Sequence, residues 1–161
     1  MEVEFLLEVS PEQDRLLQEL VETYTSTVGL LLVQKGDLPN SKDLNSNLKR
    51  SCFKSRAIAD AWLIRNRPER MIKLPSFRMN SGSYHITRNN MLAFKAFVFQ
   101  GVAVYIFRIP LIGRRLSKEH QGVLTLFKDP RGWIVEIEPK RIFNKRKEDS
   151  RLREYSSSNI I

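Results

Sequence analysis

The most regular pattern in the sequence is residues 122–138, which read GVLTLFKDPRGWIVEIE. Two apolar runs, 122–128 and 133–138, flank the turn-forming sequence Asp-Pro-Arg-Gly, so this segment predicts a β-hairpin. Glu136 and Glu138 alternate with apolar neighbours, which indicates that one face of the second strand meets water.

Further apolar runs, separated by polar turns, lie upstream of this hairpin. Residues 2–9 alternate between apolar and mostly acidic side chains, which is the period-two pattern of a half-buried strand. From residue 71 onward, Gly and Asn mark the turns, and the runs between them predict strands at 76–79, 84–87, 91–99 and 102–109. Strands at this spacing are typical of a small barrel.

Two helices are expected between the first strand and this β-rich half. Residues 10–13, Ser-Pro-Glu-Gln, place a capping Ser, a Pro and a Gln at the positions that begin a helix, and apolar residues then recur every three or four positions until about Gly36. A second helix is expected to start at Ser41 and to end at Pro68. Weak helix formers at 45–47 leave open its division into two short helices.

These patterns predict an α+β fold, a small antiparallel β-barrel of OB-like form with an N-terminal helix and a short helical insert. We expect the first strand and helix at 1–36, the helical insert at 37–74, the barrel strands at 75–139 and a basic, partly disordered tail at 140–161. Trp62 and Trp133 lie in apolar patterns and are assigned to the core.

Composition narrows the class of protein. A chain of 161 residues, 42% hydrophobic and 28% charged, is that of an ordinary globular domain. No apolar run approaches the roughly 18–20 residues that cross a bilayer, and the acidic start lacks a secretory signal, so we expect a soluble, cytoplasmic protein.

Cys52 is the single cysteine and there are two histidines, which provide neither an internal disulfide nor a zinc ligand set. No metal or cofactor is expected.

The sequence offers no recognisable catalytic group. Its acids cluster in the first helix, where Glu12, Asp14, Glu19 and Glu22 predict a solvated polar face. His85 has no predicted partner, and glycine-rich phosphate loops are absent from the sequence. We therefore expect a protein that is not an enzyme.

Positive charge is concentrated in the middle of the chain. The formal net charge is +9, yet residues 1–40 hold eight acids against two bases, whereas residues 49–115 hold fourteen bases against Asp60 and Glu69. Such a segment favours a nucleic-acid partner, because each neutralised phosphate releases counterions. From composition alone, the alternative is a solvated basic face without a dedicated partner.

The candidate nucleic-acid contacts are basic and aromatic side chains of this segment. Guanidinium groups at the end of the second predicted helix suit phosphate, because each can donate two parallel hydrogen bonds. Residues 77–88 interleave aromatic and basic side chains, an arrangement that can stack a base and hold its phosphate; for Phe77 and Tyr84 the alternative is a place in the core. The predicted phosphate contacts are Lys49, Arg50, Lys54, Arg56, Arg65, Arg67, Arg70, Lys73, Arg78 and Arg88, with Tyr84 and His85 for stacking or hydrogen bonding.

The order of these segments resembles the amino-terminal region of the transposon-encoded TnpB (OrfB) family of RNA-guided nucleases, which type V CRISPR effectors share. The resemblance covers residues 2–138. Its motifs are the opening strand with the Ser-Pro-Glu-Gln helix, Leu-Pro-Ser-Phe-Arg at 74–78, a strand at 106–113 similar to the family's Leu-Pro-x-x-Gly strand, and one at 132–137 similar to its Lys-Trp-Tyr-Val strand. The resemblance implies a wedge-like β-barrel and a helical recognition insert that grip the guide-RNA scaffold and the guide–target duplex.

This chain departs from the family pattern in three respects. Thr25, Ser26 and Thr27 stand where the family has arginine and asparagine, the insert at 37–74 is short, and the chain stops where the RuvC-like nuclease and the zinc ribbon would begin. The first departure leaves open whether recognition of a target-adjacent motif is shared. We expect a non-catalytic nucleic-acid-binding protein, with RNA preferred over DNA, acting alone or as half of a split effector. The second hypothesis is a protein–protein docking module for a separately encoded nuclease or another partner.

Overall fold

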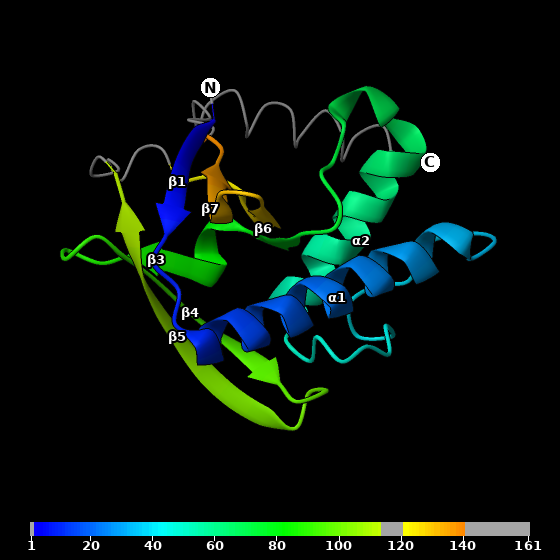
Figure 1. Cartoon of the computed structure of the whole chain (residues 1–161). Coiled ribbons are helices and arrows are strands. Elements are labelled where there is room, and N and C mark those ends of the chain that lie inside the picture. The colour runs from blue at the N-terminus through cyan, green and yellow to red at the C-terminus, as the bar shows by residue number, and fades with distance from the viewer. Residues whose placement is uncertain (1, 114–120, 141–161) are drawn as a thin grey trace, which may run out of the picture.

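The computed structural model describes residues 2–113 and 121–140 of the chain. Within them, two helices and a curled seven-stranded antiparallel sheet form a small, nearly closed α+β barrel (Figure 1). The elements are β1 Val3–Leu7, α1 Pro11–Val33, α2 Ser51–Asn66, β2 Phe77–Met79, β3 Tyr84–Ile86, β4 Met91–Val98, β5 Ala103–Ile112, β6 Leu124–Asp129 and β7 Gly132–Ile137, with single 3₁₀ turns η1 Pro68–Arg70 and η2 Ser81–Ser83. The tail predicted after residue 140 lies outside the described residues.

The sheet has the strand order β2-β6-β7-β1-β5-β4-β3, and every neighbouring pair of strands is antiparallel. Its two edge strands, β2 and β3, are consecutive in sequence and joined by η2, so the sheet curls until its edges approach each other. The hydroxyl of Tyr84 in β3 donates to the carbonyl of Gly122, just before β6, over 2.7 Å. The predicted hairpin is confirmed as β6 and β7, and β5 extends three residues beyond its predicted end.

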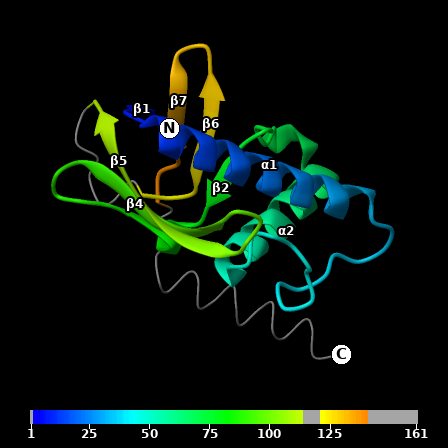
Figure 2. The ribbon, with the colours of Figure 1, turned by 60° about the horizontal axis from the view of Figure 1, so that its bottom comes forward.

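Helix α1 begins at the capping box that the sequence predicts. Ser10 Oγ accepts from the backbone N–H of Gln13 at 3.2 Å, and Gln13 Oε1 accepts from the backbone N–H of Ser10 at 3.1 Å. The apolar face of α1 is buried, with Leu17, Tyr24 and Val28 fully enclosed. Figure 2 shows α1 crossing between the β4–β5 hairpin and the β6–β7 hairpin, where it covers the core of the barrel.

The predicted start of the second helix is wrong. Residues 41–50 form turns, and α2 begins only at Ser51. The side-chain oxygen of Asn40 accepts hydrogen bonds from the backbone N–H groups of Lys42 and Asp43, both at 3.1 Å. Such a local bond favours a turn over a helix.

Trp62 is also wrongly assigned, since it is 48% exposed on α2. Phe53, Ala57 and Ala61 take the inward face of that helix instead, and Trp62 lies beside Ala61 on the outer surface. Trp133 is buried in β7 as predicted.

Phe77 in β2 joins the helices to the sheet in one hydrophobic core. Its ring meets Tyr24 of α1 and Phe53 of α2 edge-on, with centroids 5.6 and 4.9 Å apart, and lies 6.0 Å from Phe94 of β4. Edge-to-face pairs of this kind add to the stabilisation that burial provides. The core therefore fixes both helices against the barrel. None of the described helices is long and apolar enough to span a membrane.

Candidate nucleic-acid interface

The long β4–β5 hairpin divides its side chains between the core and the outside. The register pairs Phe94 with Phe107 and Lys95 with Ile106. Phe94 and Phe107 are buried, and their rings stack with centroids 4.6 Å apart. Because side chains alternate along a strand, Lys95 and Arg108 lie on the opposite, outer side, and both are exposed.

An open cavity of about 600 Å³ lies against this outer side, beside the first turn of α2. Among the described residues that line it, four are basic and none is Asp or Glu. We call these four, Arg50, His85, Lys95 and Arg108, the basic sheet face. Ser83, Thr87 and Asn89 add neutral hydrogen-bonding groups to the lining.

Arg50 connects this face to the helix. Its Nη1 donates to the carbonyl of Lys95 over 2.6 Å, and its guanidinium lies 5.0 Å from the centre of the Phe53 ring. These contacts hold the cation at the N-terminal end of α2, against β4. A guanidinium has five N–H donors, so hydrogen-bonding capacity remains for a ligand.

Apolar side chains lie on the same outer side of β5. Val104, Ile106 and Ile112 are 53%, 56% and 51% exposed, although each belongs to a well-formed strand. Exposed apolar groups next to cations are typical of a surface that contacts another molecule.

Five other predicted contacts lie outside this cavity. Arg67, Arg70 and Arg88 are exposed, and Lys54 is half-buried in the first turn of α2. The side chain of Lys49 packs against the β4–β5 turn, where a Cβ on Gly101 would lie 2.7 Å from Lys49 Cε.

Three predicted contacts already have partners within the chain. Arg65 donates to backbone carbonyls at the C-terminal end of α1. Arg56 pairs with Asp60 at 3.0 Å, and Lys73 pairs with Glu136 at 3.1 Å. Arg65 in particular serves the packing of the two helices, which leaves Arg67 and Arg70 as the exposed guanidiniums at the end of α2.

Tyr84 is a correction to the predicted surface, and Arg78 is largely enclosed. Tyr84 is 6% exposed, and its buried ring cannot stack a base. Arg78 is 4% exposed and lies 3.2 Å from Asp60 Oδ1. Both belong to the edge strands of the sheet, which turn inward as the barrel curls. Tyr84 and Phe77 are therefore core residues, which is the alternative that the sequence left open for them.

Asp60 is the centre of a buried polar cluster. Its carboxylate accepts from Tyr24, Arg56 and Arg78, which come from α1, α2 and β2. Burial, followed by the neighbouring Asp60 carboxylate, raises the pKa of Tyr24 well above its usual value. The Tyr24 hydroxyl therefore keeps its proton and donates a hydrogen bond to Asp60.

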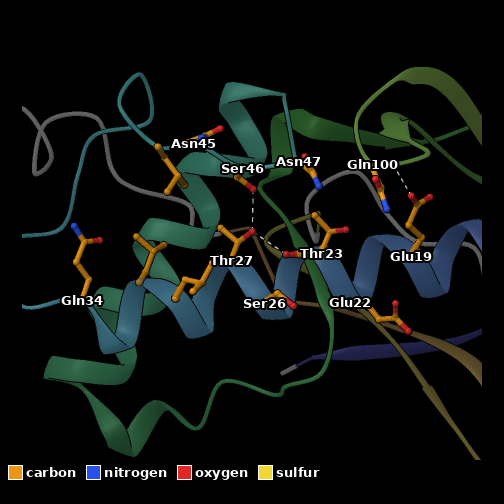
Figure 3. Close-up of a pocket in the computed structure, with 13 residues that line it drawn as sticks. Glu19, Glu22, Thr23, Ser26, Thr27, Gln34, Asn45, Ser46, Asn47 and Gln100 are labelled. Carbon is orange, nitrogen blue, oxygen red and sulfur yellow. Dashed lines mark hydrogen bonds between the residues drawn. The ribbon is translucent and has the colours of Figure 1, made fainter.

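A second cavity, of about 690 Å³, lies between α1 and residues 44–47 (Figure 3). It is lined by hydroxyl and amide groups and by Glu19 and Glu22, with no Lys or Arg among its described lining residues. The carboxylate of Glu19 accepts from the backbone N–H groups of Phe99 and Gln100 at 2.9 and 2.7 Å, which ties α1 to the β4–β5 turn. Its negative charge makes this cavity unsuitable for phosphate.

Lys95 and Arg108 are surface cations that were not predicted as contacts. The signal that could have found them is the single cation in each of two otherwise apolar strand sequences, 91–98 and 103–112, because a charged side chain in such a strand is expected on the side away from the core. In residues 2–113 and 121–140, no group of three or more His, Cys, Asp or Glu side chains could hold a metal ion.

No family model matches the chain, and no curated protein matches it. The resemblance to the TnpB family therefore stays a prediction.

Proposed function

We propose that this protein binds nucleic acid through the basic sheet face and has no catalytic role. The observation that carries the proposal is a cavity of about 600 Å³ whose described lining has four basic residues and no carboxylate. A phosphate that enters such a cavity meets no repulsion from its walls, and each cation that replaces a condensed counterion adds to the affinity.

The positions of the cations suit a strand of nucleic acid. Lys95 and Arg108 lie on neighbouring strands, in the diagonal arrangement that follows from pairing Ala93 with Arg108 and Lys95 with Ile106. Diagonal neighbours are about 7–8 Å apart, so both side chains can reach one stretch of backbone. Ile106, exposed and directly opposite Lys95, offers an apolar surface for a sugar or the edge of a base.

Structured RNA is the ligand that we favour. The preference rests on the resemblance to the TnpB family, which implies contact with a guide-RNA scaffold or a guide–target duplex. A barrel joined to helices is the arrangement that this resemblance implies. We propose that the chain acts in the cytoplasm, as a stand-alone module or as half of a split effector.

The test is a binding titration of the purified protein against a structured RNA, a single-stranded DNA and a duplex DNA. With contacts from Arg50, Lys95 and Arg108, affinity should fall roughly 20- to 40-fold between about 50 and 200 mM salt. A salt-sensitive preference for structured RNA would support the proposal. Equally weak binding of all three at the lower salt would contradict it.

A second candidate function is protein docking, which the exposed apolar residues of β5 favour. Val104, Ile106 and Ile112 lie on one side of the strand and offer apolar surface that a partner chain would bury. Co-purification separates the two candidates. A stoichiometric protein partner without nucleic acid supports docking, whereas a high ratio of absorbance at 260 to 280 nm supports nucleic-acid binding.

A further inference from the structure

A separate cavity of about 520 Å³ lies where α2, η1, β2 and the end of β7 meet. It shares no lining residue with the basic sheet face. Its volume is within the range of pockets that hold small organic ligands.

The lining of this cavity is strongly basic. Arg56, Arg70, Arg78 and Lys140 are the four cations, and Glu138 is the carboxylate among the described lining residues. Asp60, buried behind the wall, compensates one further charge through its pairs with Arg56 and Arg78. Counting the lining residues and Asp60 alone, two positive charges are left over. Glu2, whose charge interacts with those of Arg78 and Glu138, does not line the cavity, and neither does Glu136.

Two of the arginines have unused hydrogen-bond donors. Within the described part of the chain, the buried Nε atoms of Arg56 and Arg78 have no hydrogen-bond partner. A buried N–H without an acceptor is costly, so an acceptor that reached these groups from the cavity would relieve that cost. Because Asp60 holds both guanidiniums, at 3.0 and 3.2 Å, they are fixed in place before a ligand arrives.

Glu138 is a weak competitor of a ligand for the Arg78 guanidinium. Its Oε1 lies 3.6 Å from Arg78 Nη2, beyond normal hydrogen-bond distance. The Glu138 side chain is 42% exposed, so it can turn to solvent when another anion enters.

The remaining wall of the cavity is apolar. Leu63, Ile72, Val123 and Pro139 line it, and Asn80 and Ser81 add neutral polar groups. The lining thus joins a cationic part to an apolar part. A ligand that matches both carries a doubly charged phosphate on a group with an apolar face.

We propose that this cavity binds a nucleoside monophosphate unit, with the phosphate held by Arg56, Arg70 and Arg78. A phosphomonoester carries about −1.5 to −2 charges at pH 7, close to the two surplus positive charges of the site. A nucleoside monophosphate unit occurs both as a free mononucleotide and as the phosphorylated end of a nucleic-acid strand. Binding of a strand end rests on the proposed nucleic-acid binding, whereas binding of a free mononucleotide does not.

The experiment compares two pairs of probes by isothermal titration calorimetry. Adenosine 5′-monophosphate and adenosine report on the free nucleotide, and an oligonucleotide with a 5′-phosphate and the same oligonucleotide with a 5′-hydroxyl report on the strand end. Tighter binding of either phosphorylated probe, by roughly tenfold or more, supports the site and identifies the source. If neither phosphate improves binding, the proposal is overturned, while any affinity for the 5′-hydroxyl oligonucleotide still supports the basic sheet face.

Substitutions locate the effect in the cavity. Arg70→Ala removes an exposed cation of the lining and should weaken binding of the phosphorylated probe about tenfold. Glu138→Gln removes the competing carboxylate and should tighten it. Arg15→Ala, at an exposed position of α1 outside the cavity, is the matched control and should change nothing. Equal effects of Arg70→Ala and Arg15→Ala, with none from Glu138→Gln, would overturn the assignment.

Discussion

Arg65, near the end of α2, donates a hydrogen bond of 2.6 Å to the backbone carbonyl of Leu31 in α1. The same guanidinium donates to the carbonyls of Gln34 and Gly36, at 2.5 and 3.1 Å. The last carbonyl groups of a helix accept no hydrogen bond within the helix. A cation beside them supplies a donor and also lies at the negative end of the helix dipole. Arg65 therefore completes α1 from the side of α2.

Arg65→Ala should lower the free energy of unfolding by about 1–2 kcal/mol, because several carbonyls lose a charged donor. Arg67→Ala, at an exposed position two residues later, should change it by less than about 0.5 kcal/mol. Urea denaturation of the two variants measures the difference. Equal losses would show that the contacts of Arg65 do not stabilise the fold.

Asp60→Asn should be far more costly, with a loss of about 3–5 kcal/mol. The substitution removes the negative charge that compensates two buried cations, Arg56 and Arg78, and uncompensated buried charge is expensive. Chemical denaturation, or loss of soluble protein on expression, reports the effect. Asp43→Asn, at an exposed turn position, is the control and should be nearly neutral. A similar small effect at both positions would contradict the cluster's role.

Asp14 should make stability depend on pH. Its Oδ1 accepts from Trp133 Nε1 at 2.7 Å and from Lys128 Nζ at 2.9 Å, and these two bonds, that from Trp133 first, lower the pKa of Asp14 below its usual 3.8. A carboxyl with a lowered pKa in the folded state stabilises the protein above its unfolded-state pKa, and this contribution is lost as the pH falls through the folded-state pKa.

Wild type should therefore exceed Asp14→Asn in unfolding free energy by about 1 kcal/mol at neutral pH, since Asn keeps a neutral acceptor but loses the charge. The difference should shrink as the pH falls below 3.8 and vanish once Asp14 is protonated in the folded state. Denaturation at a series of pH values measures it. A difference that stays constant with pH would show that the carboxylate charge is not involved.

Much of the fold follows from local patterns. The apolar run at residues 91–99, the alternation at 133–138 and the capping box at 10–13 depend on neighbours in sequence. The structure has the strands and the helix start where these patterns put them. Ser41 failed as a helix start because the Asn40 side chain closes a turn there, which is a competing local bond.

The candidate site was harder to predict, because exposure depends on how the sheet curls. Arg78 and Tyr84 have the same local pattern as surface residues of an open sheet, yet near-closure of the barrel buries both. Arg65 looks like any exposed helix cation until α1 is packed beside it. Only tertiary contacts separate these residues from Lys95 and Arg108.

The most direct test of nucleic-acid binding by the basic sheet face is the salt dependence of affinity for structured RNA. Lys95→Ala/Arg108→Ala removes two cations from the face, and Lys35→Ala/Lys42→Ala removes two from exposed positions that do not line it. The first double variant should bind more weakly, and its slope of log affinity against log salt should be shallower by about 1.5, while the control keeps the wild-type slope. Identical slopes and affinities for the two double variants would contradict nucleic-acid binding by the basic sheet face.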